Sequence, residues 1–423
     1  MKEKTRLKYK LGLTKLKRKL TAMNLEYDTL DESNPMEHIK YRLKSDSSIK
    51  YKLEKKGLDN TDENINSKIK DVIGVRIVCP FLSDVSELIE KLQHDPEIKI
   101  ISVKDYIKNP KPNGYSSYHM IVNIPITIEN KIEYVNAEFQ IRTIIQDMFA
   151  SLDHKISYKK NVNLSDTTKE NLNKMAKKCN ELDKYFDKKY LAKSGKKEDS
   201  QKKEELFEKM EYKKMMLKYQ TALNIVKSII YQMDDNYRID EQFQKGVNPI
   251  EHIKERLKTP ERIIEKVKTQ TDNLSISSIE KTISDIAGIR IVCSFKSDLY
   301  NVINTLKNNY ELEVIKEKNY VKNPKSNGYS GYHLIVNIPV PVDNKIELVK
   351  VEIQVRTIAM DMWAIIERNL RPREMTFDER EKELHGLAYI RDHIDESMES
   401  IILESRELRQ DNIKKLTKTP TNE

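Results

Sequence analysis

The alternation of apolar and polar residues predicts a chain that begins with helices. Residues 6–30 place apolar side chains at helical spacing among lysines, which predicts an amphipathic helix. Asn34-Pro35 marks a turn, and the pattern after it predicts a second helix with apolar positions at Ile39, Leu43 and Ile49. Residues 59–67 are rich in Asn, Asp and Thr and predict a polar loop.

Strand and helix patterns then alternate. Residues 71–79 are rich in Val and Ile and predict a buried strand. The other predicted elements are a helix near 84–93, strands at about 98–103, 118–128 and 131–142, a helix at about 144–155 and a further helix to about 190. These segments predict an α+β fold, in which a mixed β-sheet is flanked by helices.

The whole pattern occurs twice. Gly114 and Gly328 are 214 positions apart, and the same offset relates residues 35–143 to residues 249–357. A repeat of this length is a duplicated domain rather than a solenoid unit. Residues 194–204 contain no apolar side chain and predict a linker. We therefore expect two tandem domains, at residues 1–193 and 205–423.

Composition narrows the class of protein. Of the 423 residues, 38% are hydrophobic and 34% are charged, which fits a soluble chain with more than one core. No apolar run approaches the roughly 20 residues that span a bilayer, and the N-terminal residues lack the apolar core of a secretory signal. Three cysteines without a CxxC pair fit a reducing cytosol, so we expect a cytoplasmic protein.

The charge balance bears on the partners. The formal net charge is +9, which favours a polyanionic ligand such as a nucleotide or RNA. Lysines scattered over solvated helices account for most of this excess. Charge alone therefore leaves nucleotides and RNA open as partners.

Polar side chains gather on one predicted strand. Glu138, Gln140 and Arg142 alternate with Phe139 and Ile141, so the three polar groups share one strand face. Three polar groups are too many for a plain core and predict a polar pocket. The pattern recurs as Glu352, Gln354 and Arg356.

Two carboxylates carry the best signal for chemistry. Asp71 and Glu138 offer the hard oxygen ligands that a Mg²⁺–nucleotide site uses. The alternative is a surface salt bridge to a nearby arginine. Both residues recur as Asp285 and Glu352, and this repetition favours a functional site.

Two further clusters surround the carboxylates. A basic group is suited to bind a polyphosphate, although on this cluster alone a solvated basic helix is the better interpretation. Its members are Arg42, Lys44, Lys52, Lys55 and Lys56. The Asn113-Gly114 turn brings Tyr115 and His119, which can stack on a base and donate to a phosphate. An ordinary hairpin turn with a packed tyrosine is the alternative.

Together these motifs resemble the RelA/SpoT synthetase domain, most closely the small alarmone synthetases. The resemblance covers roughly residues 20–190 and 215–400. Five motifs stand in the family's order: Arg42-x-Lys44-x-x-x-Ser48-x-x-x-Lys52, Asp71-x-x-Gly74-x-Arg76, Lys104-Asp105-Tyr106, Gly114-Tyr115-x-Ser117-Tyr118-His119 and Glu138-x-Gln140-x-Arg142-Thr143. The resemblance implies two tandem nucleotidyltransferase-like domains. It also implies a Mg²⁺-dependent GTP pyrophosphokinase that moves pyrophosphate from ATP to the 3′-hydroxyl of GDP or GTP and forms (p)ppGpp.

The resemblance also implies roles for named residues. Metal binding and catalysis would fall to Asp71, Glu138, Asp285 and Glu352. ATP would be bound by Arg42, Lys44, Ser48, Lys52, Lys55, Arg256, Lys258 and Lys266. The guanosine nucleotide would be bound by Tyr115, His119, Gln140, Arg142, Tyr329, His333, Gln354 and Arg356. Synthetases of this type form homo-oligomers, so we expect a homo-oligomer or an intramolecular pseudo-dimer, with no membrane or DNA partner.

The second copy departs from the pattern on its ATP side. Ser48 is replaced by Arg262, and Lys55 by Thr269, so the first copy is expected to be the catalyst. Asp153-His154 of the first copy corresponds to Glu367-Arg368, and Phe149 corresponds to Trp363.

Two alternatives stay open. One is a toxin-type relative that pyrophosphorylates the 3′ end of tRNA, favoured by the basic balance and by Ser116 and Ser330, which stand where small synthetases usually have Arg. The other is a catalytically degenerate protein that binds nucleotides or RNA. The choice among GDP, GTP and GMP as acceptor is also open.

Overall fold

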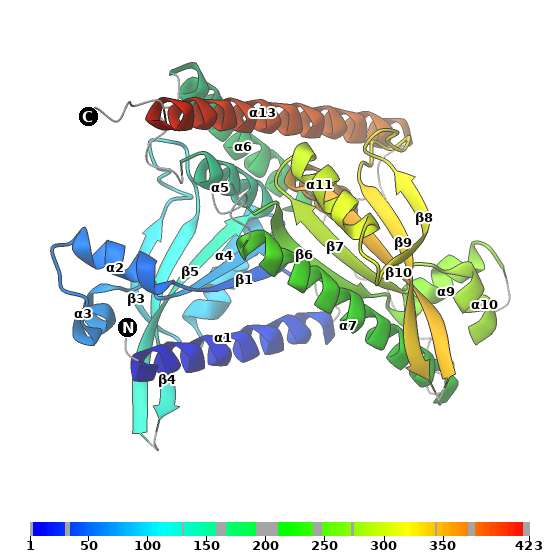
Figure 1. Ribbon diagram of the computed structural model, residues 1–423, viewed down its shortest axis with the longest axis horizontal. Coiled ribbons are helices and arrows are strands. Elements are labelled where there is room, and N and C mark those ends of the chain that lie inside the picture. The colour runs from blue at the N-terminus through cyan, green and yellow to red at the C-terminus, as the bar shows by residue number, and fades with distance from the viewer. Residues whose placement is uncertain are drawn as a thin grey trace. The chain divides into compact units, whose positions relative to one another are not determined.

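The chain forms two compact units in a computed structural model (Figure 1). One unit comprises Met1–His154 with Asn163–Ser194, and the other comprises Lys155–Val162 with Gly195–Glu423. The structure describes residues 3–29, 34–128, 131–157, 166–191, 210–239, 248–271, 275–342, 345–370 and 377–417. The predicted linker at 194–204 lies outside these residues. We call the elements α1 to α6 the first copy and the elements α7 to α13 the second copy.

The described first copy contains six helices and one five-stranded sheet. These are α1 (Glu3–Thr29), β1 (His38–Leu43), α2 (Asp46–Glu54), α3 (Asp62–Lys68), β2 (Ile73–Cys79), α4 (Leu82–Gln93), β3 (Lys99–Asp105), β4 (Tyr118–Ile128), β5 (Lys131–Thr143), α5 (Ile144–Ser157) and α6 (Asp166–Leu191). The strand order is β1-β2-β5-β4-β3. Only β2 and β5 run parallel, and every other neighbouring pair is antiparallel.

The second copy repeats this order. Its elements are α7 (Met210–Ile239), β6 (Ile250–Leu257), α9 (Pro260–Lys268), α10 (Ile276–Thr282), β7 (Ala287–Cys293), α11 (Lys296–Lys307), β8 (Glu313–Asn319), β9 (Tyr332–Val342), β10 (Lys345–Thr357), α12 (Ile358–Leu370) and α13 (Phe377–Thr417). The strand order is β6-β7-β10-β9-β8, with β7 and β10 parallel. The fold is thus α+β with two tandem domains, as predicted.

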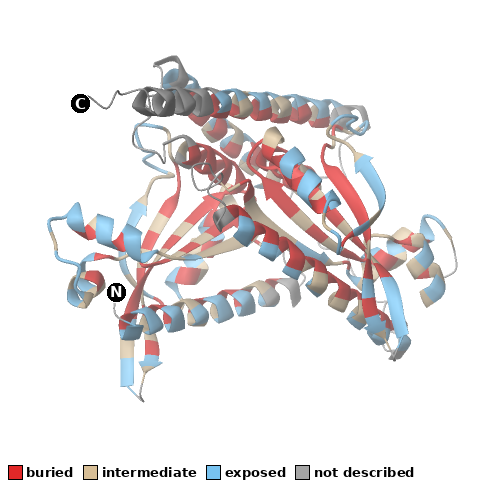
Figure 2. Cartoon of the chain, viewed as in Figure 1, coloured by how far each residue is buried: buried red, intermediate tan, exposed pale blue. Residues whose placement is uncertain are grey.

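Each sheet has one apolar and one polar face. In the first copy Val75, Phe139 and Met120 lie on the same face and pack into a core with Leu16 of α1 and Leu88 of α4. Figure 2 shows buried residues along the strands and along one side of the helices, whose other side is exposed to solvent. The period of two along a strand then leaves the opposite face for polar side chains.

Two local predictions were wrong. Residues 38–43 form the strand β1 instead of a helix, because Ile39, Tyr41 and Leu43 pair in register with β2. The helix begins only at Asp46, where Ser45 caps it. The predicted polar loop at 59–67 contains α3, whose N-terminus Thr61 caps. Arg42 therefore lies on a strand.

The other predicted elements of the first copy are found close to their expected places. The predicted strands at 118–128 and 131–142 correspond to β4 and β5, and the helix near 84–93 corresponds to α4. Among the described residues, no helix combines the length and the apolar character that crossing a bilayer requires.

Candidate active site

Glu138 is the centre of a hydrogen-bonded chain on the polar face of the first sheet. His119 pairs with Gln140 across β4 and β5, which brings its ring beside Glu138, with 3.2 Å between His119 Nδ1 and Glu138 Oε1. The other ring nitrogen lies 2.9 Å from the hydroxyl of Tyr115. Gln140 Nε2 donates to Glu138 Oε2 at 2.9 Å. Arg142 Nη2 in turn donates to Gln140 Oε1 at 2.7 Å.

This chain keeps Glu138 ionised. Burial alone would raise the pKa of Glu138, but the hydrogen bonds from His119 and Gln140 outweigh it, so the pKa lies below its ordinary value. The negative charge of Asp71 acts in the opposite direction, which shows that the two carboxylates are close enough to repel each other. Such a pair is the arrangement that a divalent cation relieves.

Asp71 is bound by two lysines. Lys44 Nζ lies 2.6 Å from Asp71 Oδ2, and Lys52 Nζ lies 2.9 Å from Asp71 Oδ1. Burial would raise the pKa of Asp71, but these hydrogen bonds outweigh it and the pKa is lowered. The two lysines thus neutralise the charge of the Asp71 carboxylate.

The residues present fit a magnesium ion that also needs the substrate. Among the described residues, no group of three or more His, Cys, Asp or Glu side chains is arranged to hold a metal by itself. Mg²⁺ is commonly bound by one or two carboxylates and completed by phosphate oxygens and water. Two ionised and mutually repelling carboxylates, Asp71 and Glu138, match that donor set.

The sequence analysis did not identify a buried carboxylate that pairs with two arginines of the site. Asp147 of α5 is 2% exposed, and its Oδ1 lies 3.3 Å from Arg76 and 3.5 Å from Arg142. Burial would raise the pKa of Asp147, but Arg76, His38 and Arg142 together hold it well below its ordinary value. A signal existed, because Asp361 occupies the same place in the repeat.

The turn before β4 presents an aromatic group. Gly114 has φ +79°, and a side chain there would collide with Ala176 of α6, so the turn requires glycine. The ring of Tyr115 meets those of Tyr106 and His119 edge to face. Lys111 Nζ lies 4.6 Å from the centre of the Tyr115 ring. Tyr106 and Lys111 were not predicted as site residues, although both recur as Tyr320 and Lys325.

The other predicted ATP-binding residues lie at the rim. Arg42, Ser48 and Lys55 are exposed, and none of them contacts the carboxylates in the described structure. Ser48 accepts a hydrogen bond from the capping Ser45 at 2.8 Å. The side chain of His154 lies outside the described residues. Ser116 is only 4% exposed, so its hydroxyl does not form part of an open surface.

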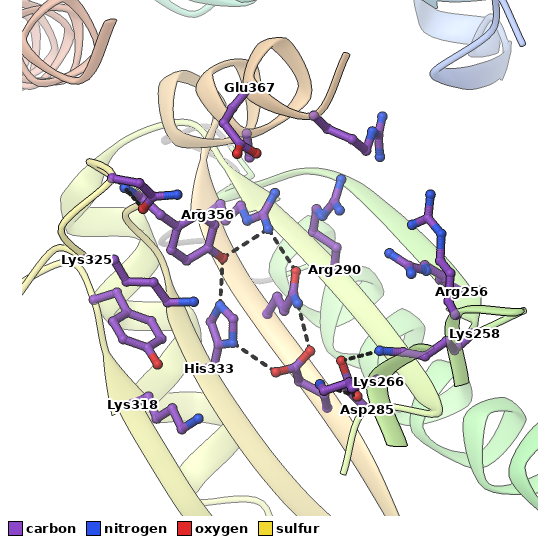
Figure 3. Close-up of a pocket in the computed structure, with 18 of the residues that line it drawn as sticks. Arg256, Lys258, Lys266, Asp285, Arg290, Lys318, Lys325, His333, Arg356 and Glu367 are labelled. Atoms are coloured by element: carbon purple, nitrogen blue, oxygen red, sulfur yellow. Dashed lines mark hydrogen bonds and ion pairs between the residues drawn. The ribbon is translucent and has the colours of Figure 1, made fainter. Parts of the chain in front are cut away.

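The second copy builds the same network around a cavity of about 780 Å³ (Figure 3). Its contacts include Lys258–Asp285 at 2.7 Å, Lys266–Asp285 at 2.8 Å, His333–Glu352 at 2.9 Å, Tyr329–His333 at 2.6 Å, Gln354–Glu352 at 2.7 Å and Arg356–Gln354 at 3.0 Å. The pKa values of Asp285 and Glu352 are lowered as in the first copy, because hydrogen bonds outweigh burial.

Two contacts hold the tyrosine of the second copy more firmly. Arg356 Nη2 donates to the Tyr329 hydroxyl at 3.0 Å, and the Tyr329 ring meets Trp363 at 6.2 Å between centroids. Arg391 of α13 donates to the carbonyl of Gly328 in the same turn. Arg391 was not predicted from the sequence.

Comparison with known proteins agrees with this geometry. The family described as "Region found in RelA / SpoT proteins" matches residues 41–163 and 255–375, more than half of the chain. The chain belongs to the RelA/SpoT family. Each match spans one of the two polar sheet faces described above.

Two GTP pyrophosphokinases are similar to this chain over less than half of its length. GTP pyrophosphokinase YwaC of Bacillus subtilis is 43% identical over 185 residues, which cover 44% of this chain and 86% of YwaC. GTP pyrophosphokinase YjbM of the same organism is 29% identical over 175 residues, or 41% of this chain and 82% of YjbM. The crystal structure of small alarmone synthetase 2 from Bacillus subtilis shares 41% identity, covers 44% of this chain and 94% of that chain, and gives a TM-score of 0.39.

Proposed function

We propose that the protein is a GTP pyrophosphokinase that transfers pyrophosphate from ATP to the 3′-hydroxyl of GDP or GTP, with the first copy as the catalyst. The observation that carries the proposal is the pair of ionised carboxylates, Asp71 and Glu138, on a sheet face lined by lysines, arginines and aromatic rings. Membership of the RelA/SpoT family and the GTP pyrophosphokinases among the relatives support it. The reaction would take place in the cytoplasm, where both nucleotides are available.

The chemistry needs positioning more than covalent catalysis. The 3′ oxygen of the acceptor forms a bond to the β-phosphorus of ATP, the bond from that phosphorus to the α,β-bridging oxygen breaks, and AMP leaves. The hydroxyl proton passes to Glu138, which is ionised and held in place by His119 and Gln140. Asp71 and Glu138 would hold Mg²⁺, which neutralises charge on the phosphates when it is bound.

The remaining residues of the first copy bind the two nucleotides. Lys44 and Lys52 would move from Asp71 to the ATP phosphates, joined by Arg42 and Ser48 from the rim, with Lys55 beside the adenine. Tyr115 would stack on guanine and His119 would contact the acceptor. Gln140 and Arg142 act on the reaction through Glu138, because their hydrogen bonds fix its orientation.

The proposal gives the second copy a lesser role in transfer. Its carboxylates are intact, but the residues at Ser48 and Lys55 are replaced by Arg262 and Thr269. The hydroxyl of Tyr329 is also held by Arg356, a bond that Tyr115 does not have in the described first copy. Both differences act on positioning, on which phosphoryl-type transfer depends.

The direct test is a transfer assay with two matched variants. The full chain is incubated with Mg²⁺, ATP labelled on the γ-phosphate, and GDP or GTP, beside Glu138→Gln and Glu352→Gln. We expect label on the guanosine nucleotide, a loss of about 10²–10⁴-fold with Glu138→Gln, because general-base catalysis contributes that much, and no change with Glu352→Gln.

Other outcomes would contradict parts of the proposal. Equal loss in both variants would mean that both copies transfer pyrophosphate. No label on any guanosine nucleotide would refute the proposed acceptor. Label on the 3′ end of added tRNA, without a guanosine product, would establish the tRNA alternative instead.

A further inference from the structure

Tyr329 of the second copy is held by its hydroxyl and by its ring. The hydroxyl lies 2.6 Å from His333 Nε2 and accepts a hydrogen bond from Arg356 Nη2 at 3.0 Å (Figure 3). The ring meets the ring of Trp363 edge to face, with 6.2 Å between the centroids. Tyr329 also lines the cavity of about 780 Å³, a volume within the range of small-molecule sites. The ring is therefore fixed in position and still accessible from the cavity.

The turn that carries Tyr329 is attached to α13, the last helix of its copy. Arg391 of this helix is 1% exposed and donates to the carbonyl of Gly328, while its other end pairs with Asp392 at 2.7 Å. Trp363 Nε1 donates to a backbone carbonyl of the same helix at 3.4 Å. Gly328 is itself buried, and a buried, close-packed turn has little room to move. The turn, the Trp363 ring and α13 thus form one packed unit beside the cavity.

The corresponding turn of the first copy is attached by weaker contacts. Asn113 Nδ2 donates to Asp153 Oδ2 of α5 at 3.1 Å, in an exposed position where water competes for both groups. Three residues after the alanine that contacts the glycine of each turn, α6 has the buried Cys179 and α13 has Arg391. Burial raises the pKa of the Cys179 thiol, so this group stays neutral and is only a weak donor.

The tyrosine of the first copy also has fewer fixed neighbours. Phe149 stands at the position of Trp363, and the described first copy has no ring contact between Phe149 and Tyr115. Within the same described part, the Tyr115 hydroxyl is hydrogen-bonded only to His119, at 2.9 Å. The two tyrosines therefore differ in how well they are ordered before a ligand binds.

Order that exists before binding raises the affinity of a site. The cost of ordering loops and side chains is subtracted from the binding free energy. A site whose turn is ordered in only a fraction of the molecules binds its ligand more weakly in proportion to that fraction. The contacts of Arg391 and Trp363 are made without a ligand, so the second copy does not meet this cost when a ligand binds.

We propose that Arg391 and Trp363 are positioning residues that fix Tyr329 for stacking on a purine base, and that the second cavity therefore binds a guanosine nucleotide more tightly than the first site does. Neither residue touches the base in this arrangement, and both act through the turn and the ring of Tyr329. The identity of the base as guanine rests on the proposed function. The fixed position of the ring does not depend on it.

Titration of the full chain with GDP, followed by tryptophan fluorescence, tests the ranking of the two sites. Trp363 is the only tryptophan and contacts the Tyr329 ring, so it reports on the second cavity. A second protein, with Phe149→Trp and Trp363→Phe, carries the same probe at the first site. We expect half-saturation of the second cavity at a GDP concentration about 10-fold lower, the effect of one hydrogen bond to a charged group. ADP, titrated in parallel, should bind the second cavity more weakly than GDP.

Stopped-flow binding of GDP to Arg391→Cys distinguishes positioning from a merely structural role. This variant has the residue of the first copy at that position. We expect the association rate to fall about 10-fold and the dissociation rate to stay the same, because only the free turn becomes less ordered. Arg391→Lys keeps a charged donor and should restore most of the association rate. Lys382→Cys changes an exposed residue of the same helix and should alter neither rate.

The other outcomes would overturn the proposal. Trp363 fluorescence that GDP does not change, or equal half-saturation of the two sites, would refute the tighter second site. An effect of Arg391→Cys on dissociation alone, or an equal effect of Lys382→Cys, would refute positioning. Equal half-saturation by GDP and ADP would refute the guanosine nucleotide as the ligand. A failure of the proposed function would instead be seen as GDP bound at Trp363 without label transferred in the assay above.

Discussion

The two copies agree on their sheets and differ in the helices around them. On the polar sheet face every member of the carboxylate network is repeated, from Lys44–Asp71 and Lys258–Asp285 to the glutamate–histidine pair. On the neighbouring helix, exposed Ser48 has become Arg262. A strand face paired on both sides tolerates little change, whereas an exposed helix position can change without affecting the core. Divergence is therefore concentrated where it alters ligands and leaves the fold intact.

A second difference concerns the turn that carries the tyrosine. In the second copy Arg391 is 1% exposed, bonds the carbonyl of Gly328 and lies 6.0 Å from the Trp363 ring. In the first copy, Ala176 contacts Gly114 as Ala388 contacts Gly328 in the second. By this alignment of the two helices, the buried Cys179 stands at the position of Arg391. The turn of the second copy is thus attached to its last helix by a charged hydrogen bond that a cysteine cannot supply.

The largest expected effect concerns the buried aspartate that both copies share. Asp147→Asn and Asp361→Asn should each destabilise their own sheet by about 3–5 kcal/mol, because each leaves a buried arginine without its carboxylate. Hydrogen exchange of β5 and β10 measures the two effects separately. A large loss in one copy with none in the other would show that the two sheets are not built alike.

The same two carboxylates make the stability of each copy fall at low pH. The pKa values of Asp147 and Asp361 lie well below the ordinary 3.8, because neighbouring arginines and a histidine outweigh burial. Their stabilisation is present above that value and is lost as the pH falls through it toward the folded pKa. The asparagine variants should lack this loss.

The next largest effect concerns the helix residues in which the two copies differ. Giving the first copy the residues of the second, by Ser48→Arg with Lys55→Thr, should slow transfer on the order of 10²-fold, because the phosphates are displaced. The reverse exchange, Arg262→Ser with Thr269→Lys in the Glu138→Gln background, should raise the residual transfer. If the first exchange leaves the rate unchanged, the helix residues do not explain the difference between the copies.

A smaller effect concerns the attached turn. Arg391→Cys should destabilise the second copy by about 1.5–3 kcal/mol, the strength of a hydrogen bond to a charged group. Trp363 is the only tryptophan, so urea unfolding followed by its fluorescence reports on this copy. Lys382→Cys changes an exposed lysine of the same helix and should leave the midpoint in place. Equal midpoints for all three proteins would contradict the role of Arg391.

The smallest expected effect is a matched pH dependence. Thr143 and Thr357 each donate to a buried aspartate, Asp183 at 2.6 Å and Asp395 at 2.9 Å. Burial raises the pKa of both aspartates to about 7. The stability that the two protonated aspartates contribute is therefore complete below the ordinary aspartate pKa of 3.8. It is lost as the pH rises through about 7.

Asparagine variants test this directly. Asp395→Asn should make the second copy less sensitive to a change from about pH 5 to about pH 8, because an asparagine cannot ionise as the pH rises through about 7. Urea unfolding followed by Trp363 fluorescence measures it. A variant that keeps the full pH dependence of the wild type would show that another group titrates.

The strands of the site could be predicted from the sequence because their signal is local. Glu138, Gln140 and Arg142 alternate with apolar residues over a few positions, and the structure places all three on one face. The strand β1 was mistaken for a helix because Ile39 and Leu43 also fit a helical spacing. Only pairing with β2 decides between the two, and a partner 30 or more residues away is invisible to a local pattern.

The sequence by itself determined the duplication, the two sheets and the carboxylates, because the spacing and the types of the residues are enough to predict each of these. The tertiary structure alone decided which groups meet. Asp147 and Arg391 looked ordinary in the sequence, because the partners that decide their roles are far away in the chain. Folding brings Arg76 to the first and the carbonyl of Gly328 to the second. Burial then makes each contact strong, because a charge removed from water needs a partner.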